Sequence, residues 1–152
     1  MKTGKNLQKA VATAAAVGGF LAVAAPQAQA ADHWQAGNWP YTDSRGVTYE
    51  KLSIPGARGN IIIYWDDSSY RVTMEGDVSD TAGDGLGATL QVSYWYQDGS
   101  SWKWTSRNLV KAGGSGTMNN ATARSLVNMK SVQARVCTYN GDNVLTRCGA
   151  WY

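Results

Sequence analysis

Residues 131–152 read Ser-Val-Gln-Ala-Arg-Val-Cys-Thr-Tyr-Asn-Gly-Asp-Asn-Val-Leu-Thr-Arg-Cys-Gly-Ala-Trp-Tyr. Val132, Ala134 and Val136 alternate with other residues, which is the pattern of a strand with one buried face. The turn-forming segment Asn-Gly-Asp-Asn at 140–143 separates this strand from a second one. The stretch therefore predicts a β-hairpin, and it points to an all-β protein.

The two cysteines of the chain, Cys137 and Cys148, lie one on each arm of this hairpin. In an exported protein we expect them to form a disulfide, which would contribute about 2–3 kcal/mol by closing the loop. A two-residue turn at Asp142-Asn143 puts the cysteines opposite each other, whereas Asn140-Gly141 has the better turn chemistry but puts Cys137 opposite Val144. A longer or bulged loop reconciles the two.

Residues 1–30 have the three parts of a signal peptide. Lys2, Lys5 and Lys9 form the basic region, Ala10–Ala25 is an apolar run, and Ala28–Ala30 is a small-x-small cleavage site. We therefore expect a secreted, extracellular protein, with no membrane segment after cleavage. Three of the 14 basic residues and none of the 11 acidic ones lie in this segment. The mature chain is then near neutral, which gives no support for nucleic-acid or membrane binding.

The mature part divides into an arm, residues 31–45, and one domain, residues 46–152. The arm lacks helical and strand periodicity, so we expect it to be irregular. It carries Trp34, Trp39 and Tyr41, which a free polar tail would not need. We favour an arm that folds back over the domain, and the alternative is a hook for a partner.

The domain is expected to hold seven or eight strands in an antiparallel β-sandwich or a flattened barrel. Val47–Ile54 reads as the first strand. Asn60–Trp65 and Tyr70–Val78 then form a hairpin. If Trp65 lies opposite Tyr70, the apolar residues of both strands share one face, which we expect to be core.

A second hairpin, from Ala88 to Val110, contains three tryptophans at positions 95, 102 and 104. A two-residue Asp98-Gly99 turn puts all three on one exposed face, as an aromatic platform. A three-residue loop instead turns Trp102 and Trp104 into the core and leaves Trp95 alone outside. The likeness to the first hairpin favours burial, and the platform stays open as the alternative.

Two loops are predicted between the hairpins. Asp77–Gly87 carries Asp77, Asp80 and Asp84, whose carboxylates suggest a calcium site, although Asp-Gly pairs are also ordinary turn chemistry. We expect no other cofactor. Residues 111–123 read as a mobile Gly-rich loop with one exposed hydrophobic residue, Met118.

Catalytic groups are scarce in this sequence. The one histidine, His33, lies three residues into the mature chain, and no nucleophile or metal motif accompanies it. We therefore expect a binding protein and no enzyme, with a small hydrolase as the remaining enzymatic alternative. Protein–protein interaction, through the arm or Met118, is favoured over carbohydrate binding by Trp95, Trp102 and Trp104.

The chain resembles small secreted β proteins of filamentous actinobacteria. The resemblance rests on the Ala-rich signal peptide, the Gly-Asp-Val-Ser-Asp-Thr-Ala stretch from Gly76, and the terminal hairpin. Such proteins include protease inhibitors, lectin-like modules and the small adaptor subunit of umbrella toxin particles. The last resembles this chain in layout, as a short exported β domain with an N-terminal extension and a protruding loop. The resemblance thus implies a protein partner, as in a toxin complex subunit.

Overall fold

The structure, a computed structural model, describes residues 33–37, 44–66 and 70–152, all within the unit Ala31–Tyr152. The described residues form nine strands and no helix. The strands are β1 (Trp34–Ala36), β2 (Ser44–Ile54), β3 (Ala57–Asp66), β4 (Val72–Asp80), β5 (Gly87–Asp98), β6 (Ser101–Ala112), β7 (Met118–Ser125), β8 (Met129–Tyr139) and β9 (Leu145–Cys148). The all-β class is confirmed. The predicted signal peptide lies outside the described residues, among which no helix is long and apolar enough to cross a membrane.

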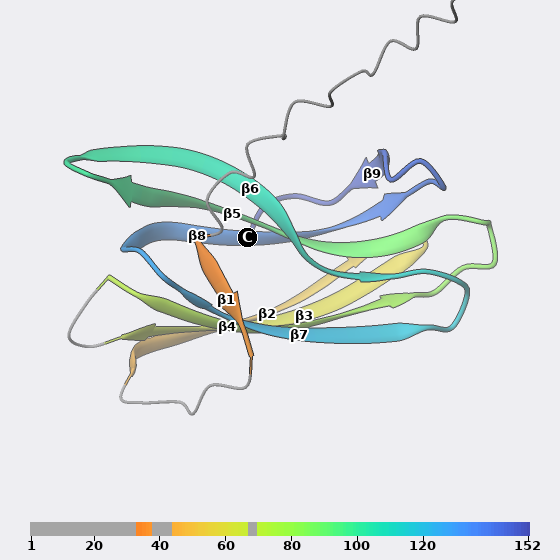
Figure 1. The fold of residues 1–152 in the computed structure, drawn as a ribbon. Coiled ribbons are helices and arrows are strands. Elements are labelled where there is room, and N and C mark those ends of the chain that lie inside the picture. The colour runs from red at the N-terminus through yellow and green to blue at the C-terminus, as the bar shows by residue number, and fades with distance from the viewer. Residues whose placement is uncertain (1–32, 38–43, 67–69) are drawn as a thin grey trace, which may run out of the picture. The chain divides into compact units, whose positions relative to one another are not determined.

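The strands form two antiparallel sheets that lie as two layers (Figure 1). The five-stranded sheet has the order β1-β7-β4-β3-β2, and the four-stranded sheet has the order β6-β5-β8-β9. All the strand pairs of the described residues lie within one sheet or the other. The fold is therefore a β-sandwich, and the flattened barrel is excluded.

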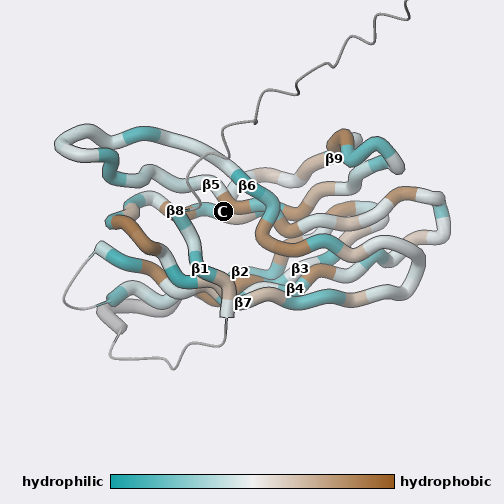
Figure 2. Tube along the Cα trace, viewed as in Figure 1, coloured by the Kyte–Doolittle hydropathy of each residue, from teal (hydrophilic) through white to brown (hydrophobic). Residues whose placement is uncertain are grey.

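The core lies between the two layers. Along β4, buried residues alternate strictly with half-buried ones, because successive side chains of a strand point to opposite faces. Hydrophobic and hydrophilic residues alternate along strands of both layers (Figure 2). Each large apolar side chain buried in this way stabilises the fold by about 1.5–3 kcal/mol. The fully buried core side chains with the largest volumes include Ile61, Val72, Met74, Val78, Leu90, Val92, Met129 and Val136.

Two glycines of the five-stranded sheet allow the layers to approach. A Cβ atom on Gly76 of β4 would lie 2.4 Å from Leu90 Cδ2 of the other sheet. A Cβ atom on Gly59 of β3 would lie 2.9 Å from Val136 Cγ2. Larger residues at these positions would force the sheets apart.

The first hairpin has the predicted faces but a different register. Trp65 lies opposite Val72, and Ile63 lies opposite Met74, whereas we expected Trp65 opposite Tyr70. The expected register is wrong by two residues. Because a shift of two keeps every side chain on its face, the hydrophobic pattern could not distinguish the two registers.

Strands extend into three segments that we expected to be irregular. The arm contains β1, which pairs with β7, and the start of β2. Strand β4 runs on to Asp80, into the predicted loop 77–87. Strand β7 begins at Met118, so the predicted loop 111–123 is reduced to 113–117. In each case a neighbouring strand pairs with the segment and overrides its polar, turn-prone composition.

The terminal hairpin has the predicted disulfide. Cys137 lies opposite Cys148, and the two sulfurs are bonded. The ladder shifts register at Tyr139, which lies opposite Leu145. The Asn140 side-chain oxygen accepts hydrogen bonds from the backbone N–H groups of Asp142 and Val144, at 3.1 and 2.9 Å. The bulged loop is thus confirmed, and it reconciles the cysteine pairing with the turn chemistry.

Candidate functional site

The second hairpin puts its three tryptophans on the outer face of the four-stranded sheet. Trp95 lies opposite Trp104, and Gln97 lies opposite Trp102. The turn is made by Gly99 and Ser100, with Gly99 at φ 60°, which suits a two-residue hairpin loop. The expected burial of Trp102 and Trp104 is therefore wrong. The tryptophans share a face as in the platform alternative, although the pairing is two residues away from the one we drew.

The physical reason lies on the opposite face of β5. Leu90, Val92 and Tyr94 supply the large buried hydrophobic residues of this face. With a two-residue turn, the β6 partners of the inward residues are Lys103, Thr105 and Arg107. The likeness to the first hairpin was misleading because the loops differ in length, and one residue of slip exchanges the two faces.

Five side chains make up what we call the aromatic surface: Tyr70, Trp95, Trp102, Trp104 and Lys130. Tyr70 and Trp104 are each 55% exposed, and Trp95 is 39% exposed. The rings of Tyr70 and Trp102 meet edge to face, with centroids 6.4 Å apart. The Lys130 ammonium lies 4.3 Å from the Trp102 ring centroid and 5.8 Å from that of Trp95.

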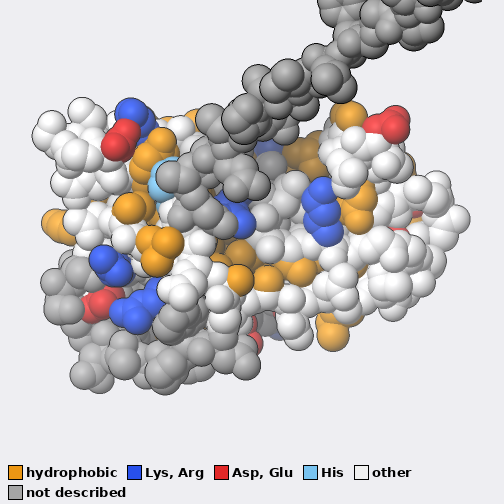
Figure 3. Space-filling model, viewed as in Figure 1, with side chains coloured by type: hydrophobic (Ala, Val, Ile, Leu, Met, Phe, Trp, Pro, Cys, Tyr) orange, Lys and Arg blue, Asp and Glu red, His pale blue; other side chains and the backbone are white. Residues whose placement is uncertain are grey.

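The aromatic surface is assembled at one end of the sandwich. The turn between β5 and β6, the start of β4 and the start of β8 all lie at this end (Figure 1). Tyr70 is joined to β8 by its backbone oxygen, which accepts a 2.7 Å hydrogen bond from the N–H of Met129. Hydrophobic side chains gather at the same end in the space-filling view (Figure 3). A contiguous exposed group of this kind is typical of an interaction site.

The amides beside the aromatic surface are engaged with each other. Asn128 Nδ2 donates to Gln97 Oε1 at 2.8 Å, and Gln97 Nε2 donates to the oxygen of Gly99 at 3.1 Å. The Gln97 backbone N–H also donates to the oxygen of Asn128 at 3.0 Å. These groups fix the hairpin against β8, which leaves the exposed rings to contact a ligand.

An ion pair lies near the tip of the same hairpin, between Lys103 and Asp98. The hydrogen bond from Lys103 and its positive charge lower the pKa of Asp98 below its ordinary value. The same hydrogen bond and the negative charge of Asp98 raise the pKa of Lys103. Both side chains are exposed, so the pair contributes little to stability. Lys103 lies opposite Tyr96, an inward residue of β5, and is therefore separate from the aromatic surface.

The described part of the arm, residues 33–37, is folded back over the domain, as we favoured. Trp34 is 3% exposed and belongs to the core, with its ring edge-on to Tyr94 at 5.2 Å. His33 stacks on Tyr96 with ring centroids 3.8 Å apart. Trp34 is thus unavailable as a hook for a partner. Trp39 and Tyr41, the other two candidates in the arm, lie outside the described residues.

The three aspartates of the calcium hypothesis have separate roles. On the outer face of β4, the Asp77 carboxylate accepts a hydrogen bond from Asn60 Nδ2, which lies 3.0 Å from each of its oxygens. Asp80, on the inner face of β4, accepts a hydrogen bond from the N–H of Ala82 at 3.1 Å. Asp84 accepts the N–H of Leu86 at 3.0 Å. In residues 33–37, 44–66 and 70–152 no group of three His, Cys, Asp or Glu side chains could hold a metal ion, and the calcium site stays a prediction.

Met118 begins β7 and is 65% exposed. It borders a hollow of about 310 Å³ on the outer face of the five-stranded sheet. The other residues around the hollow are Asn60, Ile62, Glu75, Gly76, Asp77 and Asn120. Met118 is therefore accessible, but the structure does not bring it together with the aromatic surface.

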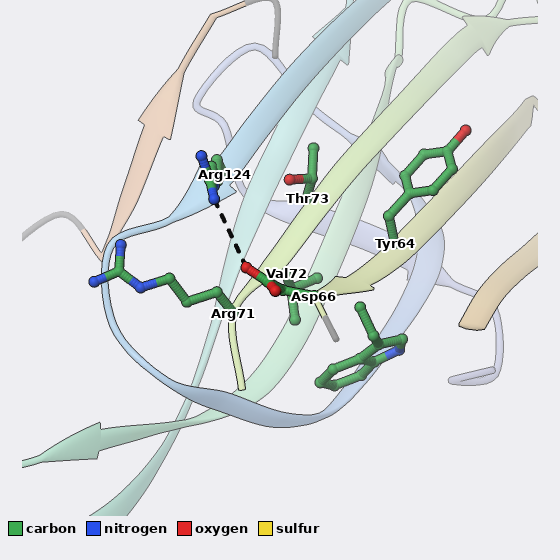
Figure 4. A pocket seen from close by; sticks show the side chains of 7 residues that line it. Tyr64, Asp66, Arg71, Val72, Thr73 and Arg124 are labelled. Atoms are coloured by element: carbon green, nitrogen blue, oxygen red, sulfur yellow. Dashed lines mark ion pairs between the residues drawn. The ribbon is translucent and has the colours of Figure 1, made fainter. Parts of the chain in front are cut away.

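A smaller cavity lies at the end of β3 and the start of β4 (Figure 4). Its volume is about 10 Å³, which is the room for one water molecule. Arg124 and Asp66 form an ion pair at 3.8 Å across it (Figure 4). The cavity is too small for a sugar ring or a partner's side chain.

Two members of the aromatic surface were missed from the sequence. Tyr70 was expected to lie on a core face, and Lys130 was not among the predicted site residues. No local pattern identifies either one, because both come to the surface through contacts between β8 and other strands. Comparison of the chain with protein families, with curated proteins and with solved structures gives no match.

Proposed function

We propose that this protein is a secreted, non-catalytic binding protein that acts through protein–protein interaction, with the aromatic surface as its contact site. The observation that carries this proposal is the exposure of Trp95 and Trp104, which lie opposite each other. Tyr70, also exposed, extends this surface through its ring contact with Trp102. Trp and Tyr side chains are the residues that dominate the binding energy of protein interfaces.

Three features support this reading. The three tryptophan rings are rigidly based, because they lie on the paired strands β5 and β6 and lose little conformational freedom on binding. The neighbouring amides of Gln97 and Asn128 are engaged with each other, which favours a partner that buries rings over one that needs free hydrogen-bonding groups. The disulfide is compatible with an extracellular site of action.

Carbohydrate binding is the second candidate. It is favoured by the shared face of Trp95, Trp102 and Trp104, since rings on one face could stack on the apolar faces of sugars. The hydroxyl groups of a sugar would then need polar partners around these rings. Lys130, whose ammonium lies 4.3 Å from the Trp102 ring centroid, is one group of that kind.

The test is capture from the secreted fraction of the producing culture by protein exported with its own N-terminal segment. Wild type and the double variant Trp95→Ala/Trp104→Ala serve as bait, and Val144→Ala is the matched control. Val144 is 58% exposed and lies in the β8–β9 turn, so its loss removes an exposed hydrophobic residue elsewhere. Retained proteins are identified and quantified by mass spectrometry.

We expect one stoichiometric protein partner with wild type and the control, and its loss with the double variant. Retention of the wild type on isolated cell wall or polysaccharide, lost in the double variant and with no protein captured, would instead establish carbohydrate binding. Equal capture by all three baits would exclude the aromatic surface as the contact site.

A further inference from the structure

Lys130 reaches the aromatic surface because β8 contains one extra residue. Ser93 of β5 lies opposite Gln133 of β8, and Trp95 lies opposite Lys130. Between these two pairs, β5 advances by two residues while β8 advances by three. In an unbroken ladder Ser131 would face Trp95, and Lys130 would point to the interior. The bulge therefore turns Lys130 outward among the tryptophans.

The bulge depends on an unusual backbone conformation. Ser131 has φ 51°, in the left-handed region that residues with a Cβ atom rarely adopt. Bulges commonly redirect a side chain next to a functional site. Conformations of this kind, held in place by the surrounding structure, are concentrated at such sites.

The charge of Lys130 has no carboxylate opposite it among the described residues, and its contacts there are the rings of Trp95 and Trp102. Two other cations of the described residues are paired with carboxylates: Lys103 with Asp98, and Arg124 with Asp66. Arg135 donates to Gln91 and stacks on Trp151. A cation held between two ring faces is in place to receive an anion.

Resting on the proposed function, we infer that the aromatic surface takes a protein segment in which an Asp or Glu side chain is next to an apolar one. The carboxylate would pair with the Lys130 ammonium, which the rings of Trp95 and Trp102 keep in position. The apolar side chain would cover the exposed ring of Trp104. Lys130 thereby determines which segments the rings accept, because a basic segment would meet a like charge.

The test uses a random peptide library displayed on phage, selected on the exported full chain. The selected peptides are then synthesised and titrated against the wild type, Lys130→Gln, Lys130→Arg and Trp104→Ala. Lys103→Gln is the matched control, since it removes a cation of the same hairpin that is separate from the aromatic surface. Thermal unfolding of each variant confirms that the fold is retained.

We expect Asp or Glu beside an apolar residue in the selected peptides. Lys130→Gln should weaken their binding about tenfold or more, as loss of a charge-assisted hydrogen bond does. Lys130→Arg should retain most of the affinity, and Lys103→Gln should not alter it. Trp104→Ala should abolish binding.

Two results would overturn the inference. If peptides bind in a Trp104-dependent way but carry no acidic residue, or bind Lys130→Gln as tightly as the wild type, the inference fails and the proposed function stands. If no selected peptide depends on Trp104, both fail together.

Discussion

Ser131 shows how one residue can determine which side chains a surface presents to the solvent. Its left-handed backbone admits the extra residue of β8, and this residue decides whether Lys130 faces the solvent or the core. The cost is local, about 1–2 kcal/mol for a residue with a Cβ atom. The burial of Met129, two residues earlier in β8, offsets this cost, because its fully buried side chain holds the strand in place.

We expect Ser131→Val to lower the free energy of unfolding by about 1–2 kcal/mol, because a β-branched side chain is the least compatible with this conformation. Ser131→Gly should be close to neutral, since glycine adopts this conformation freely but loses more entropy on folding. Urea denaturation of the two variants measures the difference. Equal destabilisation by both would show that the backbone conformation is not the cause.

At the scale of the element, the β5–β6 hairpin separates an inner face of core residues from an outer face that carries the exposed tryptophans. Tyr94 is 2% exposed, while Trp104, on the partner strand, is 55% exposed. The two residues belong to opposite faces of the same ladder. Stability and binding should therefore respond to different positions of one hairpin.

Tyr94→Ala should cost about 3–5 kcal/mol of unfolding free energy, as the truncation of a buried aromatic ring does. Trp104→Ala should cost less than about 1 kcal/mol, because its ring is largely in water. Chemical denaturation checks both values. A large loss for Trp104→Ala would mean that this ring is part of the core, as we first expected.

A feature of these elements can be predicted from the sequence when the residue pattern is compatible with only one arrangement. The alternation in β3 and β4 allows only one choice of core face, and two cysteines allow only one disulfide. The core faces of these strands and the disulfide are therefore predicted correctly. The register of the second hairpin follows from a turn that three residues, Asp98, Gly99 and Ser100, can form in several ways. The position of Lys130 depends on a bulge where it lies opposite Trp95, 35 residues earlier in the chain, which leaves no local pattern.

At the scale of the molecule, the distance between the layers is set by small residues as well as by large ones. Gly76 lies on the inner face of β4, where Leu90, Leu109 Cδ2 at 3.1 Å and the Asn60 oxygen at 3.2 Å would surround an added Cβ atom. Leu90 is fully buried, so it cannot move aside without disturbing other contacts between the sheets.

We expect Gly76→Ala to destabilise the protein by about 1–3 kcal/mol, the usual cost of overpacking a core. Gly141→Ala is the matched control, because no atom lies within 4 Å of its added Cβ. Thermal unfolding of both variants gives the comparison. If Gly76→Ala unfolds at the same midpoint temperature as the wild type, the layers can separate slightly without loss of stability.

The disulfide has a mechanical consequence, because it joins two neighbouring strands of one sheet. Cys148 ends β9, and beyond it Gly149 and Tyr152 are held to β8 by backbone hydrogen bonds. A force applied at Tyr152 would first peel off only these last residues. The load would then pass through the sulfur bridge to Cys137 in the interior of the sheet, so that the turn between the cysteines would never be stretched. If the molecule anchors a partner, tension on that end would be borne by β8 and the core it covers.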